Sequence, residues 1–183
     1  MSGFLLALLA ALAAGVGARD QVLVARMAAR QGPDQSRRPL LLLIALAAAL
    51  LSAGLAGWAG SIAAPQLVPR ARSLLVAMAL GLAALELLLV RPGRRPKEPT
   101  ASLGALAIVL LAQQAIDAAR LLIFALAASS AVPLFAVLGG MIGCAATAVL
   151  GWAGGARLAE LPLTGARRVL GVLLAAIAVL MVI

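Results

Sequence analysis

The chain has 183 residues, of which 64% are hydrophobic and only 11% are charged. Ordinary soluble domains are about 45–50% apolar and about 25% charged, so the composition excludes a disordered chain and most enzymes of aqueous metabolism. One helical membrane span needs about 20 apolar residues, and the apolar content is enough for five or six such spans. The sequence therefore predicts an all-α, polytopic membrane protein.

The net charge of +9 could indicate a nucleic-acid partner or basic links between membrane spans, and the positions of the basic residues distinguish the two. A basic soluble domain would indicate nucleic acid, but here the basic residues lie between apolar runs, so we predict no nucleic-acid partner. The surroundings are expected to be a lipid bilayer. The chain has no histidine and one cysteine, Cys144, which removes an intramolecular disulfide and the commonest transition-metal ligand. We expect neither an enzyme nor a resident cofactor.

Six apolar segments follow one another along the chain, and each is predicted to be a transmembrane helix. They cover residues 3–29, 40–64, 73–90, 102–128, 134–153 and 169–183. Pro39 and Pro133 stand directly before the second and fifth segments, where the first turn of a helix tolerates proline. No basic residue precedes the first segment, so we predict a span there and not a cleaved signal peptide.

Basic residues gather in the first, third and fifth links between these segments, which hold 11 of the 15 in the chain. They are Arg26, Arg30, Arg37, Arg38, Arg91, Arg94, Arg95, Lys97, Arg157, Arg167 and Arg168. The positive-inside rule assigns these links to the cytoplasm. We therefore predict a multi-pass protein of the plasma (inner) membrane with both termini outside the cytoplasm.

The two halves of the chain resemble each other. Pro39 and Pro133 are 94 residues apart, and so are the Gly-Trp-Ala-Gly sequences at 57–60 and 151–154. Each half would hold three spans, an odd number, so the halves would insert with opposite orientation, as in many secondary transporters. We predict two inverted three-helix repeats at 1–90 and 101–183, joined by a basic cytoplasmic linker at 91–100. A homodimer of this unit remains open.

Polar residues interrupt the first span of each half. Such residues cost about 2.5–3.5 kcal/mol in a bilayer and indicate a functional site. On a continuous helix, Gln113, Asp117 and Arg120 would form one polar stripe facing the bundle interior. The alternative is a purely structural network, in which Asp117 pairs with Arg120 three residues on. The polar residues concerned are Arg19, Asp20, Gln21, Gln113, Gln114, Asp117 and Arg120.

Two other features are predicted to be structural. Glu86 lies five residues before Arg91 and is expected to reach the interface or to pair locally. The repeated Gly-Trp-Ala-Gly sequence and the glycines Gly139, Gly140 and Gly143 are expected to let helices pack closely.

The polar stretches at 15–21 and 114–120 resemble a motif of the Gdt family of calcium/manganese–proton exchangers, which belongs to the lysine-exporter-like superfamily. In that family each of two three-helix repeats opens with Glu-x-Gly-Asp-(Lys/Arg)-(Ser/Thr), often followed by Gln. The matching residues are Gly17, Arg19, Gln21 and Asp117. The remaining acid and glycine positions hold Gly15, Ala18, Gln114 and Ile116, and Asp20 stands at the hydroxyl position.

The resemblance implies a small antiporter that exchanges Mn²⁺ or Ca²⁺ for protons at a degenerate midplane site. Both ions favour oxygen ligands. The expected ligands are Asp117, Gln114, Gln113, Asp20 and Gln21, with Asp117 the main one. The expected transport and proton-coupling residues are Asp117, Asp20, Arg19 and Arg120.

Two alternatives stay open at this point. Two arginines beside two aspartates could suit a zwitterion or a small organic anion, because guanidinium groups bind carboxylates well. The loss of motif acids would also fit a membrane accessory protein that transports nothing. A cavity lined by carboxylates would favour transport, whereas a closed and fully paired cluster would favour the accessory protein.

Overall fold

The computed structural model describes residues 2–30, 38–90, 102–115, 117–161 and 164–183. Every secondary-structure element in these ranges is a helix, so the predicted all-α class is confirmed. The elements are α1 (Ser2–Gly15), α2 (Arg19–Arg30), α3 (Arg38–Ala63), η1 (Ala64–Gln66), α4 (Pro69–Leu89), α5 (Leu103–Ala115), α6 (Ala118–Ser129), α7 (Pro133–Glu160) and α8 (Thr164–Leu180).

Several helices are long and apolar enough to cross a bilayer, as a membrane protein requires. Three of them qualify alone, over Pro39–Gln66, Pro69–Leu89 and Pro133–Gly155, and the number rises to five if each of two bent helix pairs is one span. Large apolar side chains such as Leu9, Met78 and Val172 are more than half exposed on the outer faces. Exposed apolar surface of this kind suits contact with lipid.

The first and fourth apolar segments are each broken, so the expectation of one continuous helix at 3–29 and at 102–128 is wrong. The axes of α1 and α2 differ by 61°, and those of α5 and α6 by 55°. At the first break, Gly17 has a φ of +69°, a conformation that glycine adopts without steric cost. At the second, Asp117 is extended and is the N-cap of α6.

The predicted polar stripe on one helix is therefore also wrong. Gln113 belongs to α5, Asp117 precedes α6, and Arg120 lies in the first turn of α6. The Asp117 carboxylate accepts a hydrogen bond from the backbone N–H of Ala119. An aspartate side chain at an N-cap accepts a hydrogen bond from the backbone and so stabilises the start of a new helix in place of a continuous one.

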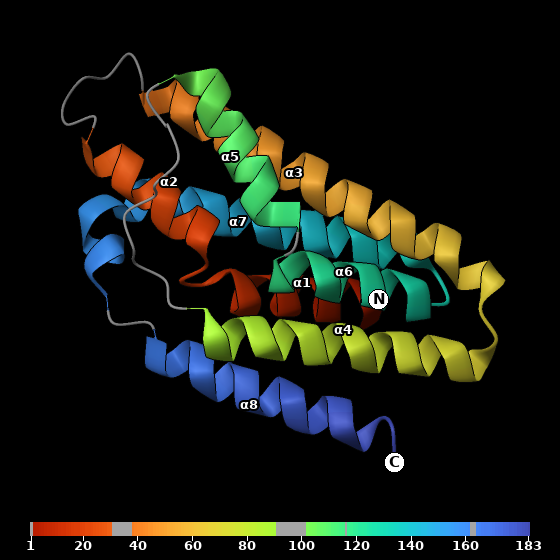
Figure 1. Cartoon of the computed structure of the whole chain (residues 1–183). Coiled ribbons are helices and arrows are strands. Elements are labelled where there is room, and N and C mark those ends of the chain that lie inside the picture. The colour runs from red at the N-terminus through yellow and green to blue at the C-terminus, as the bar shows by residue number, and fades with distance from the viewer. Residues whose placement is uncertain (1, 31–37, 91–101, 116, 162–163) are drawn as a thin grey trace.

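The helix ends that flank the basic links lie together at one end of the bundle. Figure 1 shows the last turns of α2, α4 and α7 and the first turn of α8 at the left, and η1 with the last turns of α6 and α8 at the right. Arg30, Arg157 and Arg168 are exposed near the first of these ends. Arg167 departs from the prediction, because it lies inside α8 and is only 3% exposed.

The short helices α1 and α6 lie at the centre of the bundle and contact each other. Helix α7 packs against α1, α2 and α3, while α4 packs against α6 and α8 (Figure 1). Alanines fill the centre, and Ala11, Ala118 and Ala119 are fully buried. Small side chains let helix backbones approach closely in membranes.

The glycines predicted to serve packing do so. A Cβ atom on Gly151 would lie 2.9 Å from the Gln21 carbonyl oxygen, and one on Gly143 would lie 2.9 Å from the Leu8 carbonyl oxygen. A Cβ on Gly57 would come within 2.6 Å of the Val137 side chain. These positions therefore fix the contacts of α7 with α1, α2 and α3.

We expect Gly139→Ala to destabilise the protein by about 1–3 kcal/mol, the usual cost of overpacking. The new methyl group would overlap the backbone carbonyl of Phe4 in α1. Thermal unfolding in detergent measures the effect. The matched control is Gly81→Ala in α4, where no atom lies within 4 Å of the new methyl group; it should be neutral or stabilising. Equal melting temperatures for both variants would contradict the packing argument.

Candidate functional site

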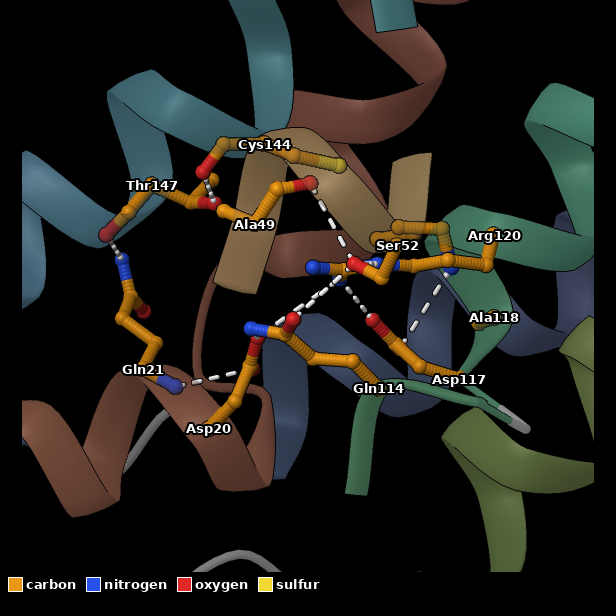
Figure 2. A network of polar contacts seen from close by, with 12 residues as sticks. Asp20, Gln21, Ala49, Ser52, Gln114, Asp117, Ala118, Arg120, Cys144 and Thr147 are labelled. Atoms are coloured by element: carbon orange, nitrogen blue, oxygen red, sulfur yellow. Dashed lines mark hydrogen bonds and ion pairs between the residues drawn. The ribbon is translucent and has the colours of Figure 1, made fainter. Parts of the chain in front are cut away.

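The two helix breaks lie side by side and bring polar residues from both halves of the chain together. Asp20 lies in the first turn of α2, and Gln114 lies in the last turn of α5. The Gln114 amide Nε2 donates to Asp20 Oδ2 at 2.9 Å. Figure 2 shows these two side chains facing each other, with Asp117 beside them.

Arg120 is the central cation of this cluster. Its Nη1 pairs with the Asp117 carboxylate, as the i,i+3 spacing predicted, and also lies 3.5 Å from Asp20 Oδ2. Its Nε donates to the Ser52 hydroxyl at 3.1 Å, and Ser52 donates in turn to Gln114 Oε1 at 2.9 Å (Figure 2). Arg120 and Asp117 are 4% and 5% exposed, so α2, α3, α5 and α6 share one buried network.

Gln21 has a different role from the other predicted ligands. Its Oε1 accepts from the Gly17 backbone N–H at 2.7 Å, and its Nε2 donates to the Thr147 carbonyl at 3.1 Å. Figure 2 shows the side chain reaching Thr147 on α7, away from Asp117. Both ends of the Gln21 amide are thus engaged in tying the first helix break to α7.

A second charged pair, Glu86 and Arg167, lies at the same level of the bundle. Glu86 Oε2 accepts a hydrogen bond from the Ala118 backbone N–H, and Oε1 lies 3.5 Å from Arg167 Nη2. Arg167 Nη1 donates to the carbonyl oxygens of Ala14 at 3.2 Å and Val16 at 3.1 Å.

The prediction that placed Arg167 in a basic link is therefore wrong. The N–H at the start of α6 and the Arg167 guanidinium hold the Glu86 carboxylate inside the bundle. Arg91, its expected local partner, lies outside the described residues. Arg167 is not a residue of a basic link but a buried cation of α8.

A cavity of about 610 Å³ opens beside these charges, between α2, α4, α5 and the start of α6. Its remaining wall is apolar and belongs to α4, α5 and α6. Three carboxylates and one guanidinium line it, whereas Arg120 and Arg167 are not part of the wall. The polar lining residues are Arg19, Asp20, Glu86, Gln113 and Asp117. The cavity therefore presents an excess of negative charge.

One wall residue has an unmet hydrogen-bonding capacity. The Oε1 atom of Gln113 is buried and has no hydrogen-bond partner within the described part of the chain. A buried acceptor of this kind costs free energy unless a donor or a cation reaches it. Arg19, also on the wall, is exposed. The arrangement can thus accept protons or a cation from the cavity side.

The carboxylates are not gathered tightly enough to form a metal centre as they stand. Within the described ranges, no three Asp, Glu or Cys side chains are placed to hold a metal ion together. A divalent cation would have to draw Asp20, Glu86 or Asp117 away from its present partner. Such an exchange of partners is compatible with a cargo that binds transiently.

No protein-family model, no curated protein and no solved structure matches this chain. The likeness to the Gdt family therefore depends on the motif residues in the sequence.

Four of the seven charged and polar residues that form these contacts were predicted from the sequence. Asp20, Gln114, Asp117 and Arg120 were predicted from their places in apolar spans, and the structure brings them together. Ser52, Glu86 and Arg167 were missed as partners. Glu86 could have been found, because it is an acid within the predicted third span, four residues before its end, and an ionisable residue in a span needs a partner.

We expect Asp117→Asn to destabilise the protein by about 3 kcal/mol, near the lower end of the cost of breaking a buried ion pair. Asparagine keeps the N-cap acceptor, so the change isolates the lost charge, while Asp20 still offers Arg120 a carboxylate. Denaturant unfolding in detergent measures the loss. Asp20→Asn is the comparison, because its side chain is 15% exposed and should cost less. Wild-type stability of Asp117→Asn would contradict a charge-paired core.

Proposed function

We propose that this chain is a small secondary transporter that exchanges a cation for protons. The observation that carries the proposal is the cavity wall, where Asp20, Glu86 and Asp117 meet beside two broken helices. Broken helices cost backbone hydrogen bonds, and membranes tolerate them where they line a cavity or are buried in protein. Transporters place substrate sites at such breaks, near the bilayer midplane.

The order of helices supports a repeat of three spans in each half. A broken pair is followed by two longer helices, first as α1–α4 and again as α5–α8. Helix α7 has a kink at Gly155, which is the last residue of its candidate span Pro133–Gly155. In the proposal α8 is the sixth span. Its 17 residues are at the short end of the range of about 17–25 residues for a transmembrane helix. The successive spans then run in alternating directions, and the two halves are inverted.

Equivalent contacts between the halves support the same arrangement. Gln21 and Arg120 are the third residues of α2 and α6. Gln21 bonds to Thr147, which lies 14 residues after Pro133, and Arg120 bonds to Ser52, which lies 13 residues after Pro39. Each broken span thus contacts the long helix of the other half at nearly the same level.

In the proposed mechanism the three wall carboxylates accept either protons or the cation. With all three ionised, Arg120 and Arg167 behind them offset two of the three negative charges. In the exchange, protons carried by these carboxyl groups in the cation-free state would leave as the cation binds, because a buried site disfavours uncompensated charge. Mn²⁺ and Ca²⁺ are the cargo that the motif resemblance suggests, and both take oxygen ligands. The proposed ligands are Asp117, Asp20, Glu86, Gln113 and Gln114.

The orientation proposed for this transporter follows its surface charge. The bundle end that carries Arg30, Arg157 and Arg168 would face the cytoplasm under the positive-inside rule. Both termini would then lie on the outer side of the plasma membrane.

Proton-driven flux in proteoliposomes tests the proposal. We expect an added Mn²⁺ or Ca²⁺ gradient to drive opposite proton movement, read by a pH-sensitive dye inside the vesicles. Asp117→Asn should slow this flux at least about tenfold, a loss equivalent to about 1.4 kcal/mol of binding. Gln66→Ala, at the opposite end of the bundle in η1, is the control and should be unaffected. Absence of ion-dependent proton flux, or unchanged flux in Asp117→Asn, would refute the proposal.

A second candidate is a transporter of a zwitterion or small organic anion. The observation that favours it is Arg120 Nη2, a buried donor with no hydrogen-bond partner within the described residues. A substrate carboxylate would satisfy such a donor. Thermal shift of the purified protein separates the two candidates: stabilisation by amino acids and not by divalent ions would favour the second.

A further inference from the structure

The Glu86–Arg167 pair contacts both helix breaks at once. Glu86 accepts from the first backbone N–H of α6, directly after the second break. Arg167 donates to the carbonyl oxygens of Ala14 and Val16, at the end of α1 and in the first break. Within the pair, these two sets of backbone contacts are joined by the ion pair between Glu86 Oε1 and Arg167 Nη2, which are 3.5 Å apart.

The signs of the two charges match the helix ends that they contact. A helix N-terminus carries partial positive charge and favours an anion, while a C-terminus favours a cation. Glu86 lies at the N-terminus of α6, and Arg167 lies at the C-terminus of α1. Each charge therefore supplies the hydrogen bonds that a break in a membrane helix would otherwise lack.

The two members of the pair differ in their access to the cavity. The Glu86 side chain lines the cavity and is 16% exposed, whereas the Arg167 side chain is 2% exposed and is not part of the wall. A cation in the cavity can therefore reach Glu86 but not Arg167. The buried Gln113 Oε1 on the same wall is a further acceptor for such a cation.

We propose that Glu86 is a positioning residue that couples the two helix breaks. A cation that binds the Glu86 carboxylate from the cavity neutralises its charge and releases its contact with Arg167. The pair then no longer links the start of α6 to the end of α1, although Asp20 still joins the breaks through Gln114 and Arg120. Occupancy next to the start of α6 is thereby transmitted to the end of α1. The release of this contact by a cation rests on the proposed transport function. The coupling of the two breaks through the Glu86–Arg167 contact does not.

Hydrogen exchange followed by mass spectrometry on the purified full chain in detergent tests the coupling. Glu86→Gln keeps an acceptor for the Ala118 N–H but removes the charge, so it imitates the neutralised state. We expect faster exchange, by roughly tenfold, the scale of one lost charge-assisted hydrogen bond. The change should occur at 117–121 and also at 14–18, a segment that Glu86 does not contact in the described structure.

Three further variants make the result decisive. Arg167→Gln should speed exchange at 117–121, although among the described residues the Arg167 guanidinium bonds to Glu86 and to carbonyls at the first break and not to 117–121. This variant replaces Glu86→Gln if Glu86→Gln fails to fold. The charge swap Glu86→Arg with Arg167→Glu restores opposite charges against the wrong helix ends, and should not restore protection. Ser52→Ala removes the hydroxyl that contacts Arg120 and Gln114 and that has no contact with the Glu86–Arg167 pair among the described residues, so it should leave 14–18 unchanged.

The outcomes separate the coupling from the transport proposal. Exchange that changes at only one break in both Glu86→Gln and Arg167→Gln would overturn the coupling. Full rescue by the charge swap would also overturn it, because a simple ion pair would then suffice. MnCl₂ added to the wild type should reproduce the Glu86→Gln pattern; no effect of MnCl₂ would reject Mn²⁺ as the cargo while the variants still decide the coupling.

Discussion

The rest of the structure depends on one constraint, which is that two helix pairs are bent by 61° and 55° at breaks inside the apolar bundle, where buried backbone groups need hydrogen-bond partners. Side chains supply those bonds. Gln21 bonds to the Gly17 N–H, Asp117 to the Ala119 N–H, and Glu86 to the Ala118 N–H, while Arg167 bonds to the carbonyls at the first break. The polar residues of the bundle are therefore concentrated at the breaks because the backbone needs them there, and the cavity lies against the same residues.

The charges at the breaks also stabilise one another. Asp20 and Asp117 share Arg120, and Glu86 faces Arg167, so no carboxylate of this group is buried without a nearby cation. Burying one unpaired ion costs several kcal/mol, whereas a paired and hydrogen-bonded ion costs far less. The arginines stand behind the wall and the carboxylates form it. As a result, a chain with a net charge of +9 offers a negative surface to whatever enters the cavity.

Much of the fold could be predicted from the sequence, because membrane helices need long apolar runs and basic links. The breaks could not, since glycine and aspartate also occur inside continuous helices, and nothing in the local pattern around Gly17 and Asp117 requires a bend of 55–61°. Arg167 was placed in a link because Arg168 follows it and Arg157 precedes it in a basic region. Its burial depends on carbonyl groups at the end of α1 and in the first break, about 150 residues earlier in the chain, and such long-range contacts leave no local signal.

The helix breaks are a stronger argument for the location of the proposed transport site than the family motif is. Only four motif residues are in place, and one of them, Gln21, is engaged with Gly17 and Thr147. An interrupted helix is expensive in a bilayer wherever it occurs, so two interruptions at the same level need a compensating benefit. Two ordinary helices would have packed there with no need for Asp20, Asp117 and two buried arginines. The cost of the interruptions and their compensating charges therefore indicates a site at this level, and this argument does not require the cargo of the exchanger family.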